Sequence, residues 1–460
     1  MDDGKDNATA VALLLAQWLS DLTPERIPEA VAAAVIDSVI DTTGLSVAAR
    51  GTDYIAALTA AWDGDGPCTA LGHGGGHDAA GAAMINGTAA HGEDFDNTFE
   101  GCPVHSGTVI VPAVLAAAER GGLDGGRVVA GMAAGIEVMC RLGLVSGKGV
   151  HSAGFHPTAV LGTFGATCGV GVALGLSARE LANALGLAGS MASGIIEYLA
   201  DGSWTKRMHA GWAAQSGIHA ALMGRAGFTG PATVFEGTHG FFSGFAPSIT
   251  PDFGHLTDGL GEVWQTENLA FKPYACGTMA QPFVDCAIQL ANKGIDAQDI
   301  ATITCEVGEG TVHRLWEPLA LKHRPPTPYG AKFSSPYCIA IGFLDGDAGL
   351  GQFTQARIQD PAVQSLAAKI SYQIDPDDEY PKNYTGHVRA TLKDGTVIEV
   401  RQPHLRGGAR EKISRGDLVK KFQANVAFGG WPEDLGAGLL EFSETLAQCR
   451  DVSALRTFRG

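Results

Sequence analysis

The 460-residue chain lacks the sequence patterns of several protein classes, and each missing pattern excludes one of them. It has 32 Lys and Arg residues against 49 Asp and Glu residues, a formal net charge of −17, and no run of basic residues. Nucleic-acid binding depends on neutralising phosphates, so we expect no nucleic-acid partner. An acidic protein also repels anions at long range, so an anionic substrate would need a local cluster of Lys, Arg and His side chains.

Cysteine pairs at disulfide or metal-binding spacing are missing too. The nine cysteines are scattered, odd in number and without a CxxC pair. This pattern argues against a disulfide framework or a zinc site and indicates reduced thiols in a cytoplasmic protein. The N-terminal stretch begins acidic, with one lysine ahead of a short apolar segment, and is more typical of an amphipathic helix than of a secretory signal.

Glycine, by contrast, is abundant. The chain holds 63 glycines without the Gly-X-Y period of collagen, and many lie inside apolar, Ala-rich stretches. This placement indicates helices that pack closely through small residues. The uncharged segment 158–176 is long enough to span a membrane, but its five glycines, its His-Pro start and the lack of a basic flank favour a buried helix and no membrane partner.

Hydrophobic periodicity predicts a first half built from helices. Apolar residues recur three and four positions apart, Gly, Pro or Asp stand at the turns, and strand patterns are almost absent. The expected helices cover residues 8–20, 28–48, 53–63, 78–90, 106–120, 126–145, 157–175, 178–193 (with Ser177 as the cap) and 206–225.

The pattern changes near residue 263. Residues 299–307 alternate in polarity, and Asp394-Gly395 between two alternating runs predicts a hairpin over residues 387–400 with a type I′ turn. Further helices are expected at 278–293, 334–345, 362–369, 415–427 and 433–448. The predicted fold is mainly α with an α+β part. A large all-helical domain begins with residues 1–262, a smaller α+β domain covers 263–404, and C-terminal helices over 405–460 complete the helical domain.

The first candidate for chemistry is the segment 91–107, which places four acids and two histidines between two expected helices. A calcium loop is excluded, because Phe99 stands where that loop needs glycine and His105 where it needs a bidentate glutamate. A thiolate pair of Cys102 with His105 is a second alternative, although an unreactive cysteine is more common. The third is proton exchange between a substrate and these carboxylates and imidazoles. A polar helix cap at Asp96 or Asn97 is the structural alternative.

Two further stretches carry histidine or cationic groups at expected helix starts. His156 precedes Pro157, which suits a first helical turn, so the imidazole would lie beside backbone N–H groups able to hold a carboxylate. A core or cap histidine is the alternative there. Three cationic or near-cationic residues open the last helix of the first half: Lys206, Arg207 and His209. Positive charge at that end opposes the helix dipole unless an anion is bound, and a solvated first turn is the alternative.

Five stretches, in this order and spacing, resemble the MmgE/PrpD family, and the likeness covers nearly the whole chain. They are AAMINGTAAHGEDFDNT (82–98), GFHPTAV (154–160), TKRMHAGWAAQSG (205–217), FKPYACG (271–277) and KFSSPY (332–337). The family includes 2-methylcitrate dehydratase, cis-aconitate decarboxylase and iminodisuccinate epimerase. The resemblance implies a large helical domain with a smaller α+β lid, a homodimer, and catalysis without a metal or organic cofactor.

The resemblance also assigns site residues and shows departures from the family pattern. The matching motif residues are Asp94, Thr98, His156, Lys206, Lys272 and Tyr337. His105 stands one place later than the histidine of the His-Pro-Ser-Gly motif that is frequent in the family. Gly277 occupies a place where cis-aconitate decarboxylases have histidine, and Gln281 the place of another family histidine. Decarboxylation of cis-aconitate is therefore not the first expectation.

We therefore expect a cofactor-free, cytoplasmic lyase of the dehydratase type, which removes a proton next to a carboxylate of a small di- or tricarboxylate. The expected catalytic residues are Asp94, His105, His156, Lys206 and Tyr337, and the expected substrate-binding residues are Thr98, Arg207 and Lys272. Cationic groups would stabilise the charge that develops on the substrate, and the remaining groups would move protons. The alternatives are epimerisation by return of the proton on the opposite face, decarboxylation of the cis-aconitate type, and carboxylate binding without turnover.

Overall fold

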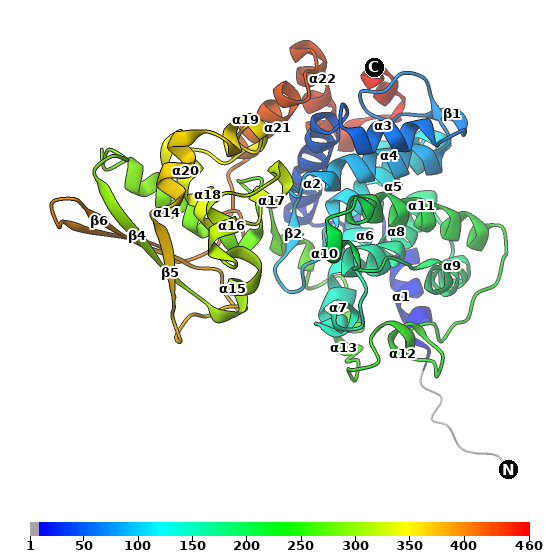
Figure 1. The fold of residues 1–460 in the computed structure, drawn as a ribbon. Coiled ribbons are helices and arrows are strands. Elements are labelled where there is room, and N and C mark those ends of the chain that lie inside the picture. The colour runs from blue at the N-terminus through cyan, green and yellow to red at the C-terminus, as the bar shows by residue number, and fades with distance from the viewer. Residues whose placement is uncertain (1–8) are drawn as a thin grey trace. The chain divides into compact units, whose positions relative to one another are not determined.

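The computed structural model describes residues 9–460, which divide into two compact units (Figure 1). Unit 1 is formed by the chain up to Gly92, by Asp96–Leu269 and by Asn425–Gly460. Unit 2 is formed by Ala270–Ala424 together with the three residues Glu93–Phe95. The mainly helical fold with a smaller α+β part is the one expected from the sequence.

Unit 1 is a helical body whose long helices pack directly on one another. Helix α6 packs on α8, and α11 packs on both α4 and α8. The long helices are α1 (Val11–Ser20), α2 (Glu29–Ala48), α3 (Asp53–Ala60), α4 (Ala79–Gly92), α5 (Gly107–Gly121), α6 (Gly125–Ser146), α8 (Pro157–Leu174), α9 (Ala178–Met191), α11 (Thr205–Arg225) and α22 (Glu433–Glu444). Shorter elements are α7 (Gly149–Ser152), α10 (Tyr198–Asp201), α12 (Phe241–Phe245), α13 (Gly254–Thr257), β1 (Asp65–Cys68) and β2 (Thr98–Phe99). The start of α9 is capped by Ser177, as predicted, in a reciprocal capping box with Glu180.

Small residues let these helices approach closely, as the glycine content predicts. A Cβ atom added to Gly135 of α6 would lie 2.8 Å from the carbonyl oxygen of Gly165 in α8. A Cβ added to Gly165 would lie 2.9 Å from the carbonyl oxygen of Gly135. Any side chain at these positions would overlap backbone of the facing helix, so the glycines set the distance between α6 and α8.

Three helices have the length and composition of a membrane span: α2, α6 and α8. Within the structure, 72% of the most apolar window of α2 and 94% of those of α6 and α8 are buried. Helix α8 is the segment expected to be a buried helix, and every residue from Pro157 to Ala173 is buried.

Unit 2 combines a four-stranded sheet with helices. The strand order is β5-β4-β6-β7, with β4 parallel to β5 and antiparallel to β6. The elements are β3 (Leu269–Ala270, at the boundary of the two units), α14 (Gln281–Ala291), β4 (Ile300–Val307), α15 (Glu309–Leu315), α16 (Leu319–His323), α17 (Pro328–Ala331), α18 (Ser335–Asp345), α19 (Gln355–Ile358), α20 (Pro361–Ala367), β5 (Ile370–Ile374), β6 (Gly386–Leu392), β7 (Val397–Gln402) and α21 (Arg415–Phe428), which runs on into unit 1. Helix α14 packs on β6, β7 and α18, and buries the apolar side of the sheet.

The predicted hairpin is present as β6 and β7, but its predicted turn type is wrong. A type I′ turn needs positive φ at both central residues, and only Gly395 has one, at 87°. The Gly395 N–H donates to the carbonyl oxygen of Leu392 at 3.0 Å, and the Leu392 N–H donates to that of Thr396 at 2.8 Å. These bonds define a three-residue loop that ends on a left-handed glycine. The Asp394 carboxylate accepts from the Thr396 N–H at 2.9 Å, which stabilises Asp394 without a positive φ.

All nine cysteines are free thiols, eight of them buried, which agrees with the expectation of no disulfide framework. Burial raises the pKa of Cys102 to about 12, and its Sγ lies 3.7 Å from the carbonyl oxygen of Gly147. The thiolate alternative for Cys102 and His105 is therefore wrong, because a thiol with so high a pKa stays protonated at neutral pH.

Candidate functional site

Four histidines gather in unit 1 and form what we call the imidazole cluster: His91, His105, His156 and His209. His91 lies at the end of α4, His105 just before α5, His156 at the N-cap of α8, and His209 near the start of α11. Ring centroids are 5.0 Å apart for His91 and His105, 5.7 Å for His91 and His156, and 5.2 Å for His156 and His209. All four side chains are buried, because the helices that carry them pack on one another.

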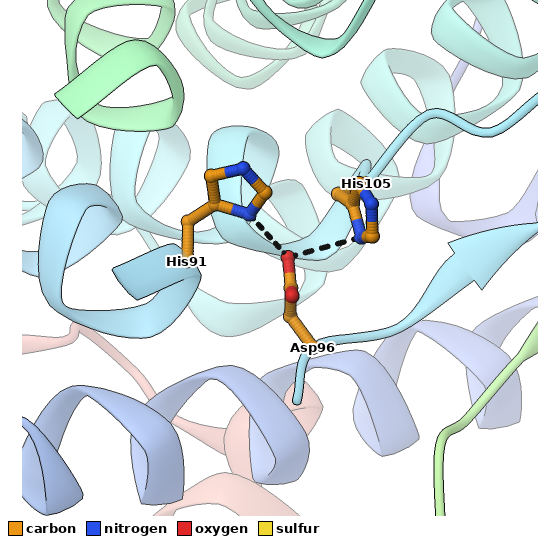
Figure 2. A group of neighbouring side chains, drawn as sticks. All are labelled: His91, Asp96 and His105. Atoms are coloured by element: carbon orange, nitrogen blue, oxygen red, sulfur yellow. Dashed lines mark hydrogen bonds and ion pairs between the residues drawn. The ribbon is translucent and has the colours of Figure 1, made fainter. Parts of the chain in front are cut away.

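Asp96 joins two of these rings (Figure 2). Its Oδ2 lies 2.7 Å from Nδ1 of His91 and 3.2 Å from Nδ1 of His105. Burial opposes ionisation of this fully buried carboxyl group, but the His105 and His91 rings and their hydrogen bonds outweigh burial and hold the pKa of Asp96 well below its usual value. Asp96 is therefore a buried carboxylate whose main partners are two imidazoles.

The hydrogen bonds around Asp96 fix the tautomers of both rings. A carbonyl oxygen can only accept, and Nδ1 of His105 lies 2.9 Å from the carbonyl oxygen of Asn97, so this nitrogen carries the hydrogen. Nδ1 of His91 likewise donates to the Asp96 carboxylate. In the neutral form of either ring, the lone pair is therefore on Nε2. Nε2 of His91 is buried and has no hydrogen-bond partner among residues 9–460.

The ligand atoms of His91, Asp96 and His105 lie close enough together to be considered as a metal site. Single ligand atoms of His91, Asp96 and His105 all lie within 4.8 Å of one another. However, the nitrogen atoms that face the carboxylate are the protonated Nδ1 atoms, and a metal ligand must be deprotonated. The donor set therefore does not fit a metal while these hydrogen bonds are made. It fits a carboxylate that orients two imidazoles for proton transfer.

Three rings of the imidazole cluster, those of His91, His156 and His209, have lowered pKa values, which favours their neutral forms. Burial lowers the pKa of His91 and, together with the neighbouring His91 and His209 rings and Lys206, holds the pKa of His156 well below its usual value. Burial, His91 and Lys206 lower the pKa of His209 to about 4. Nδ1 of His156 lies 3.1 Å from Nδ1 of His209, a contact in which one neutral ring donates and the other accepts. The negative charge of a carboxylate bound among these rings would raise their pKa values and favour their protonated forms.

The remaining expected residues of unit 1 lie near the same helix ends. Lys206, half-buried in the first turn of α11, is close enough for its ammonium charge to depress the pKa values of His91, His156 and His209. The Arg207 guanidinium stacks 4.5 Å above the Tyr54 ring. The Thr98 hydroxyl lies 3.5 Å from the carbonyl oxygen of Val104, within its own loop. The structure thus brings His105, His156 and Lys206 into one cluster.

Asp94, Lys272 and Tyr337 belong to unit 2. The Lys272 ammonium donates to the Asp94 carbonyl oxygen at 2.8 Å and lies 3.4 Å from Asp94 Oδ1. The hydroxyl of Tyr329, a residue that sequence reasoning did not select, donates to Asp94 Oδ2 at 3.1 Å. The Tyr337 hydroxyl donates instead to the carbonyl oxygen of Gln352 at 2.6 Å, and burial raises its pKa. Within unit 2, Tyr329 rather than Tyr337 is the tyrosine that contacts Asp94.

Two family models cover most of the chain. Residues 14–253 match the MmgE/PrpD N-terminal domain, and residues 274–433 match the MmgE/PrpD C-terminal domain. The chain belongs to the MmgE/PrpD family. This MmgE/PrpD protein is 28% identical over 390 residues to cis-aconitate decarboxylase of Homo sapiens, with 82% of this chain and 78% of that protein covered. It is 26% identical over 399 residues to cis-aconitate decarboxylase of Aspergillus terreus, covering 80% and 79% respectively. A cis-aconitate decarboxylase-like protein of Aspergillus oryzae is 26% identical over 411 residues, 84% of each chain.

Sequence reasoning missed several members of these networks. His91, Asp96 and His209 lie inside the stretches that were singled out, but none of them was among the expected catalytic or substrate-binding residues. A local signal existed for His91 and Asp96, since a carboxylate five residues after a histidine at a helix end can hydrogen-bond to that histidine. No local signal marks Lys421, which bonds to the carbonyl oxygen of Phe95 from 326 positions away.

Proposed function

We propose that this MmgE/PrpD protein is a lyase that acts on a small di- or tricarboxylate by moving a proton at the carbon next to a carboxylate. The observation that carries the proposal is the Asp96-bound pair of imidazoles, whose Nε2 lone pairs belong to a buried cluster next to Lys206. Relatives named cis-aconitate decarboxylase, which cover about four fifths of this chain, support an enzyme of this class.

The chemistry follows from the difficulty of the proton transfer. A carbon acid beside a carboxylate is weak, because its conjugate base adds charge to a group that is already negative. Lys206 would stabilise that charge inside a water-poor site, where a fixed cation acts more strongly than in water. His105, hydrogen-bonded at Nδ1 to a carbonyl and a carboxylate, would take or return the proton at Nε2. Asp96 would stabilise the imidazolium that forms.

Among lyase reactions we place dehydration first. In that reaction the proton and a hydroxyl group on the adjacent carbon leave, and water is the second product. Decarboxylation is the second candidate, favoured by the names of the relatives. We place decarboxylation second because this chain has Gly277 at the position where, by the family resemblance, cis-aconitate decarboxylases have a histidine. Epimerisation remains a third alternative and would use the same proton abstraction.

The same proposal includes the setting in which the enzyme works. We propose a cytoplasmic homodimer that needs no cofactor. The free thiols support a reducing compartment. The dimer and the independence from a cofactor rest on the family resemblance.

Incubation in deuterated water with a panel of acids tests the function. The panel would hold 2-methylcitrate, citrate, cis-aconitate, iminodisuccinate and malate, each followed by NMR and mass spectrometry. Dehydration gives an unsaturated product and loss of water, decarboxylation gives carbon dioxide and a deuterated product, and epimerisation gives deuterium uptake without loss of mass. Activity should survive exhaustive chelation of metals. Absence of both product and deuterium uptake for every acid would contradict the proposal for this substrate class.

A further inference from the structure

Three successive carbonyl oxygens in unit 2 each accept a hydrogen bond from a different lysine. The ammonium groups of Lys332, Lys272 and Lys421 donate to the carbonyl oxygens of Glu93, Asp94 and Phe95, respectively. The distance is 2.8 Å for Lys272 and 2.6 Å for Lys421. We call these three residues the lysine clamp.

The lysine clamp is buried, which is unusual for this residue type. The exposed fractions are 3% for Lys272, 1% for Lys332 and 8% for Lys421. The three lysines come from separate elements: the loop after β3, the end of α17 and the middle of α21. Burying an ammonium group costs free energy unless hydrogen bonds replace its water. Three separate elements therefore each bury a charge at the same short segment.

Lys421 makes further contacts that hold it in place. Besides the Phe95 carbonyl, it donates to the carbonyl oxygen of Lys272 at 2.9 Å, and its Nζ lies 3.8 Å from the centre of the Phe95 ring. It thus ties the segment Glu93–Phe95 to the loop that carries Lys272. Its sequence neighbour Lys420 is exposed and pairs with Asp417 on the same helix, which makes Lys420 a matched control.

The segment held by the lysine clamp has an unusual backbone. Asp94 has a φ of 57°, the only positive value at a residue other than glycine in the part of the chain that the structure describes. The left-handed conformation is unfavourable for an L-residue, although Asp adopts it more readily than most, and such residues persist where the surroundings enforce them. Hydrogen bonds from a charged donor are stronger than those between neutral groups, and three of them hold this segment.

The enforced turn decides where the Asp94 carboxylate points. In this conformation Oδ2 accepts from the Tyr329 hydroxyl and Oδ1 lies 3.4 Å from the Lys272 ammonium. The Glu93 carboxylate is 2.9 Å from the Lys332 ammonium. The left-handed residue is thus the one whose carboxylate contacts the Lys272 ammonium and the Tyr329 hydroxyl.

We propose that the lysine clamp holds Asp94 in its left-handed conformation and so aims its carboxylate for proton transfer, which makes Lys332 and Lys421 positioning residues. The inference rests on the proposed function, with Asp94 in the catalytic role that the family resemblance implies, and on the geometry of unit 2 alone for the clamp.

The first test replaces the Lys421 ammonium in the full-length protein. Lys421→Met keeps most of the side-chain volume but removes the donor, and Lys421→Arg keeps charge and donors. We expect Lys421→Met to lower kcat about 10- to 100-fold, the scale of a misplaced reacting group, while KM changes less than about threefold. Lys421→Arg should restore most of kcat, and Lys420→Met should behave as the parent.

The second test needs no substrate. Hydrogen–deuterium exchange followed by mass spectrometry should show faster exchange in peptides covering residues 91–98 of Lys421→Met, with other peptides of unit 2 unchanged. Asp94→Gly provides a cross-check, because glycine adopts positive φ without cost. If the clamp holds strain, Lys421→Met should destabilise the protein less in the Asp94→Gly background than in the parent.

The outcomes separate this inference from the function on which it rests. Unchanged exchange and unchanged kcat in Lys421→Met overturn it, as does a change of exchange spread evenly over unit 2 with no rescue by Lys421→Arg. An equal loss of stability in both Asp94 backgrounds also overturns it. If the parent protein turns over none of the acids, the proposed function fails, and the exchange and stability tests still decide whether the clamp exists.

Discussion

The two units bury polar side chains in opposite ways. Unit 1 buries an imidazole cluster that burial keeps largely uncharged, with Asp96 as its carboxylate. Unit 2 buries three ammonium groups beside Glu93 and Asp94 and satisfies them with carbonyl oxygens. A neutral cluster can change its protonation when a charged substrate arrives, whereas a fully bonded set of ions resists change. If the proposed function is correct, we expect unit 1 to change its protonation when substrate binds and unit 2 to hold its ions in place.

Replacing His105 should cause the largest loss of kcat, and it tests whether the imidazole cluster transfers the proton. His105→Asn retains a donor for the Asn97 carbonyl but has no group that can take a proton. We expect kcat to fall about 10²- to 10⁴-fold, the range for loss of a general acid or base, with the fold intact by circular dichroism. The matched control is His219→Gln, at an exposed position on α11. A loss below about tenfold would remove His105 from the proton-transfer step.

A smaller effect is expected when the charge between the two rings is removed. Asp96→Asn keeps the shape of the side chain but replaces charge-assisted hydrogen bonds to His91 and His105 with weaker ones. Such bonds contribute about 1.5–3 kcal/mol, which corresponds to roughly a 10- to 100-fold loss in kcat. The rate should be measured under saturating substrate, with KM determined alongside. A change in KM alone would mean that Asp96 supports binding rather than the orientation of the imidazoles.

The neutrality of the imidazole cluster also predicts how stability depends on pH. The pKa of His209 is about 4 in the folded protein, below its unfolded value of about 6.5. Between these values the unfolded chain binds the proton and the folded chain does not, so stability falls as the pH falls through this window. The lowered pKa values of His91 and His156 act in the same direction.

Urea unfolding of His209→Gln measures this contribution. The stability difference between the parent and the variant should shift by roughly 2 kcal/mol in favour of the variant between about pH 7 and pH 5. His219→Gln should show no such shift. Parallel behaviour of the parent and His209→Gln across that range would show that the cluster takes up protons in the folded state, and the contrast between the units would be lost.

The helices of unit 1 could be predicted because their signals are local. Apolar spacing, Pro157 and Ser177 mark helix boundaries within a few residues of where the structure has them. Strand β5 had no such signal, since it is five residues long and pairs in parallel with β4, more than 60 positions earlier. The turn after β6 was predicted with the wrong type, because Asp394 gains its stability from a side-chain hydrogen bond that sequence spacing does not reveal.

In the candidate site, too, local sequence signals predicted some residues but not the contacts made between distant parts of the chain. His156 and Lys206 were selected by motif and His105 from the segment rich in acids and histidines. The three lie in one cluster, since packed helices carry them. Asp94 and Asp96 are two residues apart in the chain, yet the first bonds within unit 2 and the second within unit 1. The positive φ at Asp94 accompanies this separation. In the proposed clamp, Lys272, Lys332 and Lys421 hold this conformation. The first two lie in motifs that the sequence shows, whereas no local pattern identifies Lys421.

The smallest expected effect concerns the contact between the helices that carry the imidazole cluster. Helix α4 carries His91 and α11 carries His209, and a Cβ added to Gly211 of α11 would lie 2.2 Å from the carbonyl oxygen of Met84 in α4. Gly211→Ala should therefore push the two helices apart and lower the free energy of unfolding by about 1–3 kcal/mol, the usual cost of overpacking.

This variant separates the effect of helix packing from that of the titrating groups, because it moves the rings but replaces none of the histidines. If close packing is what keeps the imidazoles neutral, Gly211→Ala admits water, and its stability should fall less steeply than that of the parent as the pH is lowered. Gly51→Ala is the matched control, since nothing lies within 4 Å of the added Cβ. Equal stability of the two variants would show that α4 and α11 shift at no cost. In that case the geometry of the imidazole cluster would depend on Asp96 rather than on helix packing.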